Sequence, residues 1–184
     1  MQVSSNKNIG PNPPRASVLG WPVLMWATTT TFVLIFVGLT ALAPLALGYG
    51  HESSANILYE MFGRVCHQNP ERAFYVGGHP LAVCARCTGI YLGFAMGVLA
   101  YPIVRSLRRV DAPARKWLIW AAVPTVLDFS LGFLGILENS HLSRWATGAL
   151  LGGAAAFYVV PGLVDLSLMA SRRSAVLFES ANER

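Results

Sequence analysis

Long apolar stretches dominate the pattern of hydrophobic and polar positions, and they predict membrane-spanning helices. No charged residue occurs between residues 16 and 50, and about 20 apolar residues are enough to cross a bilayer. The first predicted span runs from Trp21 to about Leu45. The alternative is a signal peptide cleaved near Ala43, but the apolar part of a signal peptide is only about 7–15 residues long. Further spans are predicted at about 87–104, 117–137 and 145–169.

Between the first two apolar stretches, the pattern changes to that of an amphipathic helix. Its apolar residues recur at helical spacing and are Ile57, Leu58, Met61, Phe62 and Val65. Polar residues occupy most of the remaining positions, so this helix is predicted to lie along the membrane face. It would deliver Cys66 and His67 to that face.

The pattern as a whole predicts an all-α, polytopic membrane protein. Its expected architecture is a four-transmembrane-helix bundle with an outer amphipathic helix and a cysteine-rich loop. Residues 1–20 are predicted to be a flexible cytoplasmic tail, residues 21–170 a single membrane domain, and residues 171–184 a second cytoplasmic tail. The composition agrees with a membrane protein, because only 12% of the residues are charged whereas soluble domains average about 25%.

Lysine and arginine are distributed unevenly between the two ends of the predicted spans. Of the 14 such residues, ten lie in the terminal segments and the loop 105–116. The other four are Arg64, Arg72, Arg86 and Arg144. Because cytoplasmic segments carry the excess of positive charge, both termini are predicted to be cytoplasmic, in the inner (plasma) membrane of the cell, with the cysteines outside. The predicted partner is the lipid bilayer, and the few charges argue against nucleic acid.

Glycines recur every four residues in the second predicted span, at Gly89, Gly93 and Gly97. Such spacing lets another helix approach closely. The fourth span carries Gly148 and Gly152, so these two spans are predicted to pack together. The alternative is that these glycines only reflect the tolerance of membrane helices for glycine.

All three cysteines of the chain lie close together in one segment. Cys84 and Cys87 form a Cys-x-x-Cys motif, whose sulfurs lie on one side of a tight turn, as a tetrahedral metal requires. Cys66 and His67 complete a predicted Cys3His site. Zinc is the expected metal, with another transition metal as the alternative, and His79 is a rival fourth ligand.

Two other uses of these cysteines remain open. A Cys-x-x-Cys at the start of a helix has its first thiol acidified, which favours thiol–disulfide exchange. Buried cysteines also serve as simple packing residues. Thiols outside the cell tend to oxidise. One metal shared by all three cysteines accounts for their odd number, and so does one Cys84–Cys87 or Cys66–Cys84 disulfide with a free thiol.

Two motifs carry a resemblance to a known family. The first is Cys-His-Gln, beginning at Cys66 and followed by Arg72-Ala73-Phe74, and the second is Cys-Ala-Arg-Cys-Thr-Gly-Ile-Tyr-x-Gly, beginning at Cys84. They resemble a family of small bacterial and archaeal integral membrane proteins that is known as a domain of unknown function. The resemblance covers roughly residues 55–160. It implies a multi-helix membrane protein and supplies no activity.

A carboxylate in the third predicted span gives a second candidate for chemistry. Asp128 lies well inside this span, where a charge is costly unless it faces the bundle interior and is paired. Its predicted partner is Arg86 or Arg144. One interpretation is an ion pair that fixes helix register. The other is a polar pocket, including Asn139, in which Asp128, Arg144 and Arg86 are the candidate catalytic residues.

Three functions follow from these features. The first is a metal-dependent enzyme that acts on an amphipathic small molecule or lipid, with arginines binding an anionic head group. The second is a non-catalytic assembly or metal-handling protein that is stapled by the metal. The third is a thiol–disulfide redox protein. The sequence identifies no substrate and no protein partner.

Overall fold

The computed structural model describes residues 15–182, with side chains from 20 to 170. The elements are α1 (Arg15–Gly48), α2 (Glu52–Gly63), a 3-10 turn η1 (Pro70–Arg72), β1 (Ala73–Val76), β2 (His79–Cys84), α3 (Ala85–Val104), α4 (Lys116–Phe133) and α5 (His141–Asn182). Most of the predicted tail 1–20 lies outside the described residues. The backbone of α5 continues through most of the segment 171–184, which was predicted to be a tail.

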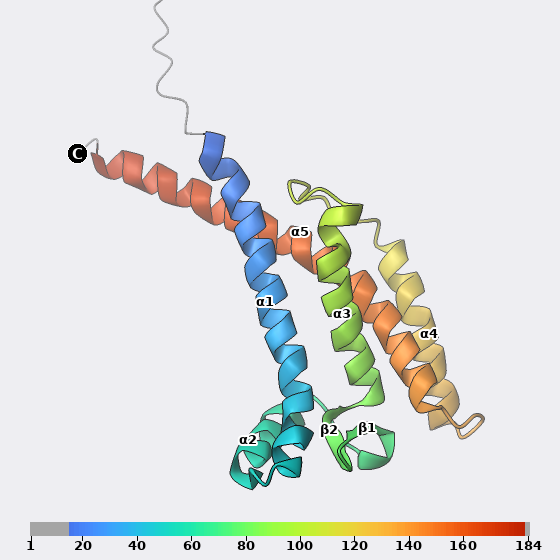
Figure 1. Ribbon diagram of the computed structural model, residues 1–184. Helices are drawn as coiled ribbons and strands as arrows, with labels where there is room; N and C mark the ends of the chain where they lie inside the picture. The colour runs from blue at the N-terminus through green and yellow to red at the C-terminus, as the bar shows by residue number, and fades with distance from the viewer. Residues whose placement is uncertain (1–14, 183–184) are drawn as a thin grey trace, which may run out of the picture.

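Four long helices make up the body of the molecule, and α2 and the two strands gather at one end of it (Figure 1). The chain passes down α1 to this end, back along α3, down α4 and back along α5. The turn between α4 and α5 lies at the same end as the strands, whereas the α3–α4 loop lies at the opposite end (Figure 1). This path places the cysteine segment and the start of α5 at one end, as the predicted topology requires.

Three helices in the described part of the chain are long and apolar enough to cross a membrane. They span Gly20–Gly48, Ala85–Val104 and His141–Ala170. The helix α4 occupies the position of the third predicted span but is not among them, because Lys116 and Asp128 reduce its hydropathy. The described part of the chain therefore has three candidate membrane-spanning helices where the sequence predicts four spans, and a crossing by α4 stays a prediction.

Helices α3 and α5 pack in parallel through glycines. A Cβ added at Gly93 would overlap the backbone of Ala149, and one added at Gly152 would overlap the backbone of Ile90. Each helix therefore presents glycine to the other, which lets the two backbones approach closely. The predicted contact between the second and fourth spans is confirmed.

The predicted cysteine-rich loop contains a small β-hairpin, which the all-α prediction missed. Strand β1 pairs antiparallel with β2, and Val76 lies opposite His79. The turn between them is Gly77-Gly78, with φ angles of 59° and 84°. Two consecutive residues with positive φ are typical of the type I′ turn that joins hairpin strands, so this Gly-Gly pair was the signal for the hairpin.

The hairpin packs with α2 against the end of α1. The buried residues of this contact are Ala43, Phe62, Cys66, Ala82 and Val83. They come from α1, from α2 and the turn after it, and from β2. This small core fixes the end of β2 beside the end of α2, and it thereby sets the position of the cysteines.

Candidate metal centre and its cavity

The three cysteines converge at the junction of α2, β2 and α3. Cys66 lies just after α2, and its N–H bonds to the carbonyl of Phe62 at 2.9 Å. Cys84 ends β2, and Cys87 lies in the first turn of α3. The three sulfurs lie within 4.8 Å of one another, and none of them is in a disulfide. Sulfurs that share a tetrahedral ion at about 2.3 Å are separated by about 3.8 Å, so three sulfurs within 4.8 Å of one another lie close to the spacing of such a site.

Gln68 holds the two cysteine-bearing segments together, a role that the sequence analysis missed. Its side-chain amide donates hydrogen bonds to the carbonyl of Tyr59 at 2.7 Å and to that of Ala82 at 2.8 Å. The Tyr59 hydroxyl adds a bond of 2.5 Å to the carbonyl of Pro80. These bonds tie α2 to β2. The signal in the sequence was the Cys-His-Gln motif, in which only the first two residues were assigned a function.

The environment of Cys84 favours the thiolate form. Hydrogen bonds from the side chains of Cys66 and Cys87 hold the pKa of Cys84 far below the ordinary thiol value, and the backbone N–H groups of Cys87 and Arg86 contribute in the same direction. Burial opposes this effect but does not outweigh it. Since the thiolate is the form that binds metals, the arrangement suits metal binding. The Cys66 sulfur in turn accepts the backbone N–H of Cys84 at 3.2 Å.

A cavity of about 490 Å³ lies beside the cysteine cluster. Its lining residues are Val65, Cys66, His67, Asn69, Arg72, Cys84, Arg86, Cys87, Phe129 and Arg144. The predicted ligand His67 is exposed and lines this cavity, but its ring does not belong to the group of converging ligand atoms. The rival ligand His79 begins β2 at the end opposite Cys84, about 16 Å away at the rise of a strand.

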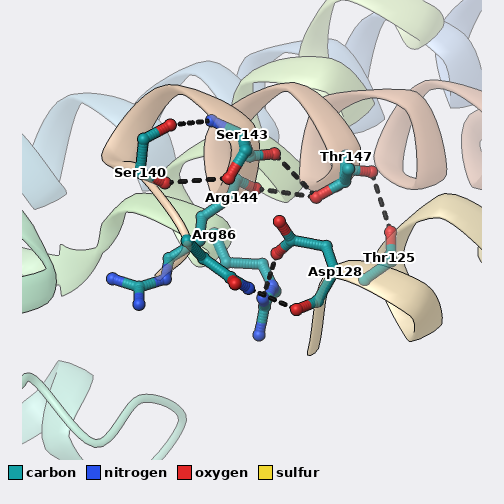
Figure 2. A network of polar contacts seen from close by, with 8 residues as sticks. Arg86, Thr125, Asp128, Ser140, Ser143, Arg144 and Thr147 are labelled. Atoms are coloured by element: carbon teal, nitrogen blue, oxygen red, sulfur yellow. Dashed lines mark hydrogen bonds and ion pairs between the residues drawn. The ribbon is translucent and has the colours of Figure 1, made fainter. Parts of the chain in front are cut away.

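Asp128 pairs with Arg86, one of its two predicted partners. Figure 2 shows the Arg86 guanidinium meeting the carboxylate of Asp128, while Arg144 points away from the pair. The side chains of Arg86 and Asp128 are 21% and 11% exposed. The amide of Asn139 donates to the Asp128 carbonyl, and Arg86 also lies 5.5 Å from the centre of the Phe129 ring. Of the predicted polar residues, the structure brings Arg86 and Asn139 to Asp128, whereas Arg144 lines the cavity instead.

A second contact holds α4 to α5 beside this pair. The Thr125 hydroxyl donates to the carbonyl of Thr147 at 2.9 Å, and the Thr147 hydroxyl donates to that of Ser143 at 2.9 Å (Figure 2). The first bond joins α4 to α5, and the second lies within α5. The bond between the helices lies one turn before Asp128 in α4, so it helps to hold Asp128 beside α5.

Comparison with known proteins gives one family and two relatives. The family model described as "Predicted membrane protein (DUF2085)" matches residues 66–158. Uncharacterized protein MJ1492 of Methanocaldococcus jannaschii is 35% identical over 133 residues, which cover 70% of this chain and 85% of the relative. An uncharacterized protein of Methanothermobacter thermautotrophicus is 35% identical over 91 residues, which cover 50% of this chain and 80% of the relative. No solved structure matches the chain.

Proposed function

This chain belongs to the DUF2085 family of predicted membrane proteins, and we propose that it binds one metal ion, zinc, through Cys66, Cys84 and Cys87. The observation that carries the proposal is the convergence of the three sulfurs within 4.8 Å. They come from two segments that a core and the Gln68 hydrogen bonds hold together. Cysteines that only fill space in a core would not need hydrogen bonds that hold their two segments together.

The metal site has the character of an open rather than a closed site. Structural zinc sites have four protein ligands, whereas catalytic ones keep three and leave a position for water or substrate. Here three sulfurs converge, His67 stands apart from them, and a cavity adjoins them. An ion held in this way can polarise a bound group or activate water. This favours a metal-dependent enzyme for an amphipathic substrate over a metal-stapled assembly or metal-handling protein.

Within this function, the candidate catalytic residues have different roles. Asp128 is already paired with Arg86, so we assign this pair to positioning the start of α3 against α4. Arg144 lines the cavity and is half-buried, so it is the residue we assign to substrate binding. Replacing Asp128 with asparagine should therefore lower the stability of the fold, and any effect on catalysis would follow from that loss.

The proposed setting is the inner membrane, with both termini in the cytoplasm. In this arrangement α4 also crosses the membrane, as the third of four spans along the chain. Its 18 residues extend about 27 Å, close to the roughly 30 Å of a bilayer core. Its outer face carries exposed apolar side chains such as Ile119, Val126 and Phe133, which suit contact with lipid, while Asp128 faces the bundle.

Metal analysis of the purified protein tests the proposal. We expect about one zinc per chain in the wild type and a loss of zinc when Cys66, Cys84 or Cys87 is replaced by serine, since each supplies one ligand. The control is His79→Gln, which should keep the metal. Metal-free wild-type protein with a reversible Cys84–Cys87 disulfide would contradict the proposal in favour of the redox function.

The variant His67→Gln tests the open position. Zinc retained at the wild-type level agrees with three protein ligands and a fourth position in the cavity. Zinc lost from this variant, but not from His79→Gln, would instead make His67 the fourth ligand and the site a closed one.

A further inference from the structure

The cavity beside the cysteines is rich in arginine. Arg72 comes from η1, Arg86 from α3 and Arg144 from α5. None of the lining residues is an aspartate or glutamate. Within the described part of the chain, Arg86 is paired with Asp128, whereas the side chains of Arg72 and Arg144 have no carboxylate partner. Two arginines that line the cavity therefore have no carboxylate partner among the described residues.

We propose that this cavity binds a phosphate group between Arg72, Arg144 and the fourth coordination position of the metal. The inference rests on the proposed metal site and names the ligand class of that site. Guanidinium groups bind phosphate oxygens through paired, charge-assisted hydrogen bonds. Arg144 is a half-buried residue that lines the cavity without a carboxylate partner among the described residues, and an anionic ligand would supply its counter-charge.

The balance of charge distinguishes an anion site from arginines that merely offset the thiolates. A divalent ion neutralises two of three thiolates, so the loaded site carries a single negative charge. Asp128 neutralises Arg86. The two positive charges of Arg72 and Arg144 exceed the single negative charge of the metal-loaded cysteines by one. The loaded cavity thus keeps a net positive charge, which attracts an anion.

The cavity also has an apolar side. Phe129 and Val65 line it, and their side chains are largely exposed. Phe129 belongs to α4, and Val65 follows α2, whose Ile57 and Met61 are exposed as well. A phosphate held by the arginines would therefore have apolar surface beside it, which suits the phosphate of a lipid head group as well as a free phosphate ion.

Binding measurements on zinc-loaded protein test the inference. The probes are inorganic phosphate and short-chain phosphatidic acid, titrated calorimetrically, with diacylglycerol as the uncharged comparison. The variants are Arg72→Gln and Arg144→Gln. The matched control is Arg64→Gln, because Arg64 is exposed near the end of α2 and does not line the cavity.

We expect Arg144→Gln and Arg72→Gln each to weaken phosphate binding by about tenfold, as the loss of a charge-assisted hydrogen bond requires. Arg64→Gln should change it less than about twofold, in line with a screened surface charge. In cobalt-loaded protein, the phosphate probe should shift the visible absorption bands of the metal. Tighter binding of phosphatidic acid than of phosphate identifies a lipid as the source, and equal binding identifies a free anion.

The outcomes separate this inference from the metal site itself. Wild-type protein that retains zinc but binds neither probe overturns the phosphate site alone, as does equal binding by Arg64→Gln and Arg144→Gln. Wild-type protein without zinc overturns the metal site and this inference together. Zinc content is measured in all three arginine variants. If it stays at one ion per chain, weaker phosphate binding does not come from loss of the metal.

Discussion

The contact between α3 and α5 predicts a large effect from a very small substitution, Gly93→Ala. A Cβ at this position would lie less than 3.0 Å from the backbone of Ala149, and backbone atoms cannot rotate away as a side chain can. The two helices would have to separate by roughly 1 Å, and a gap of about 0.5–1 Å already forfeits a quarter to a half of the dispersion energy of the contacts affected. We therefore expect a loss of about 1–3 kcal/mol, the range for overpacking a close contact.

The matched control is Gly38→Ala in α1, where an added Cβ would meet nothing within 4 Å. Both substitutions improve helix propensity by about 0.5–1 kcal/mol, so the difference between the variants isolates the packing at Gly93. The assay is equilibrium unfolding of the detergent-solubilised protein, followed by circular dichroism. Equal stability of Gly93→Ala and Gly38→Ala would refute the close α3–α5 contact.

Four further predictions concern the polar network, the cysteines and the topology. Asp128→Asn should lower the unfolding free energy by about 1–3 kcal/mol, because it leaves Arg86, whose side chain is only 21% exposed, without a counter-charge. Glu60→Gln, at an exposed carboxylate that is in neither ion pair of the described residues, should cost less than about 0.5 kcal/mol; equal losses would contradict the role of the pair. Gln68→Leu should loosen the cysteine segment, seen as faster amide hydrogen exchange there than in α4, and unchanged exchange would argue against the tie. In metal-free protein, the lowered pKa of Cys84 keeps its thiolate present at pH values well below the ordinary thiol pKa, so its alkylation should stay fast at pH 6. An alkylation rate that falls about tenfold per pH unit below pH 8 would contradict a lowered pKa. A reporter fused to the C-terminus should be cytoplasmic, and an external signal would overturn the proposed topology.

The helices and their packing could be predicted from the sequence because they depend on local patterns. Uncharged apolar stretches indicate spans by length alone, and the four-residue spacing of Gly89, Gly93 and Gly97 predicts the contact that α3 makes with α5. A membrane crossing by α4 is indicated less strongly by the same criterion. Its Asp128 and Lys116 reduce the very hydropathy on which such a prediction rests.

The hairpin was not predicted because an apolar, membrane-type composition is typical of helices. Strands of four and six residues are too short to show a clear alternating pattern, and the Gly77-Gly78 pair was the one local signal of the turn. The convergence of the cysteines was predicted from the Cys-x-x-Cys spacing, but their supports were not. Gln68 acts through two backbone carbonyls far apart in sequence, and no local pattern reveals such partners.

The sequence limited the candidate partners of Asp128 to two arginines but did not decide between them. Arg86 and Arg144 both lie near the starts of helices that were expected to meet the third span. The choice depends on the rotation of α3 and α5 about their axes, which the glycine contact fixes. With Gly93 against Ala149, Arg86 faces Asp128 and Arg144 faces the cavity.

The most direct test of the central claim is X-ray absorption at the zinc edge of the purified protein. A metal held by Cys66, Cys84 and Cys87 predicts three sulfur atoms at about 2.3 Å and one oxygen or nitrogen at about 2.0 Å. The sulfur shell should fall to two atoms, or the zinc should be lost, in Cys66→Ser. A first shell of only oxygen and nitrogen atoms, or an unchanged sulfur shell in that variant, would contradict the three-cysteine metal site.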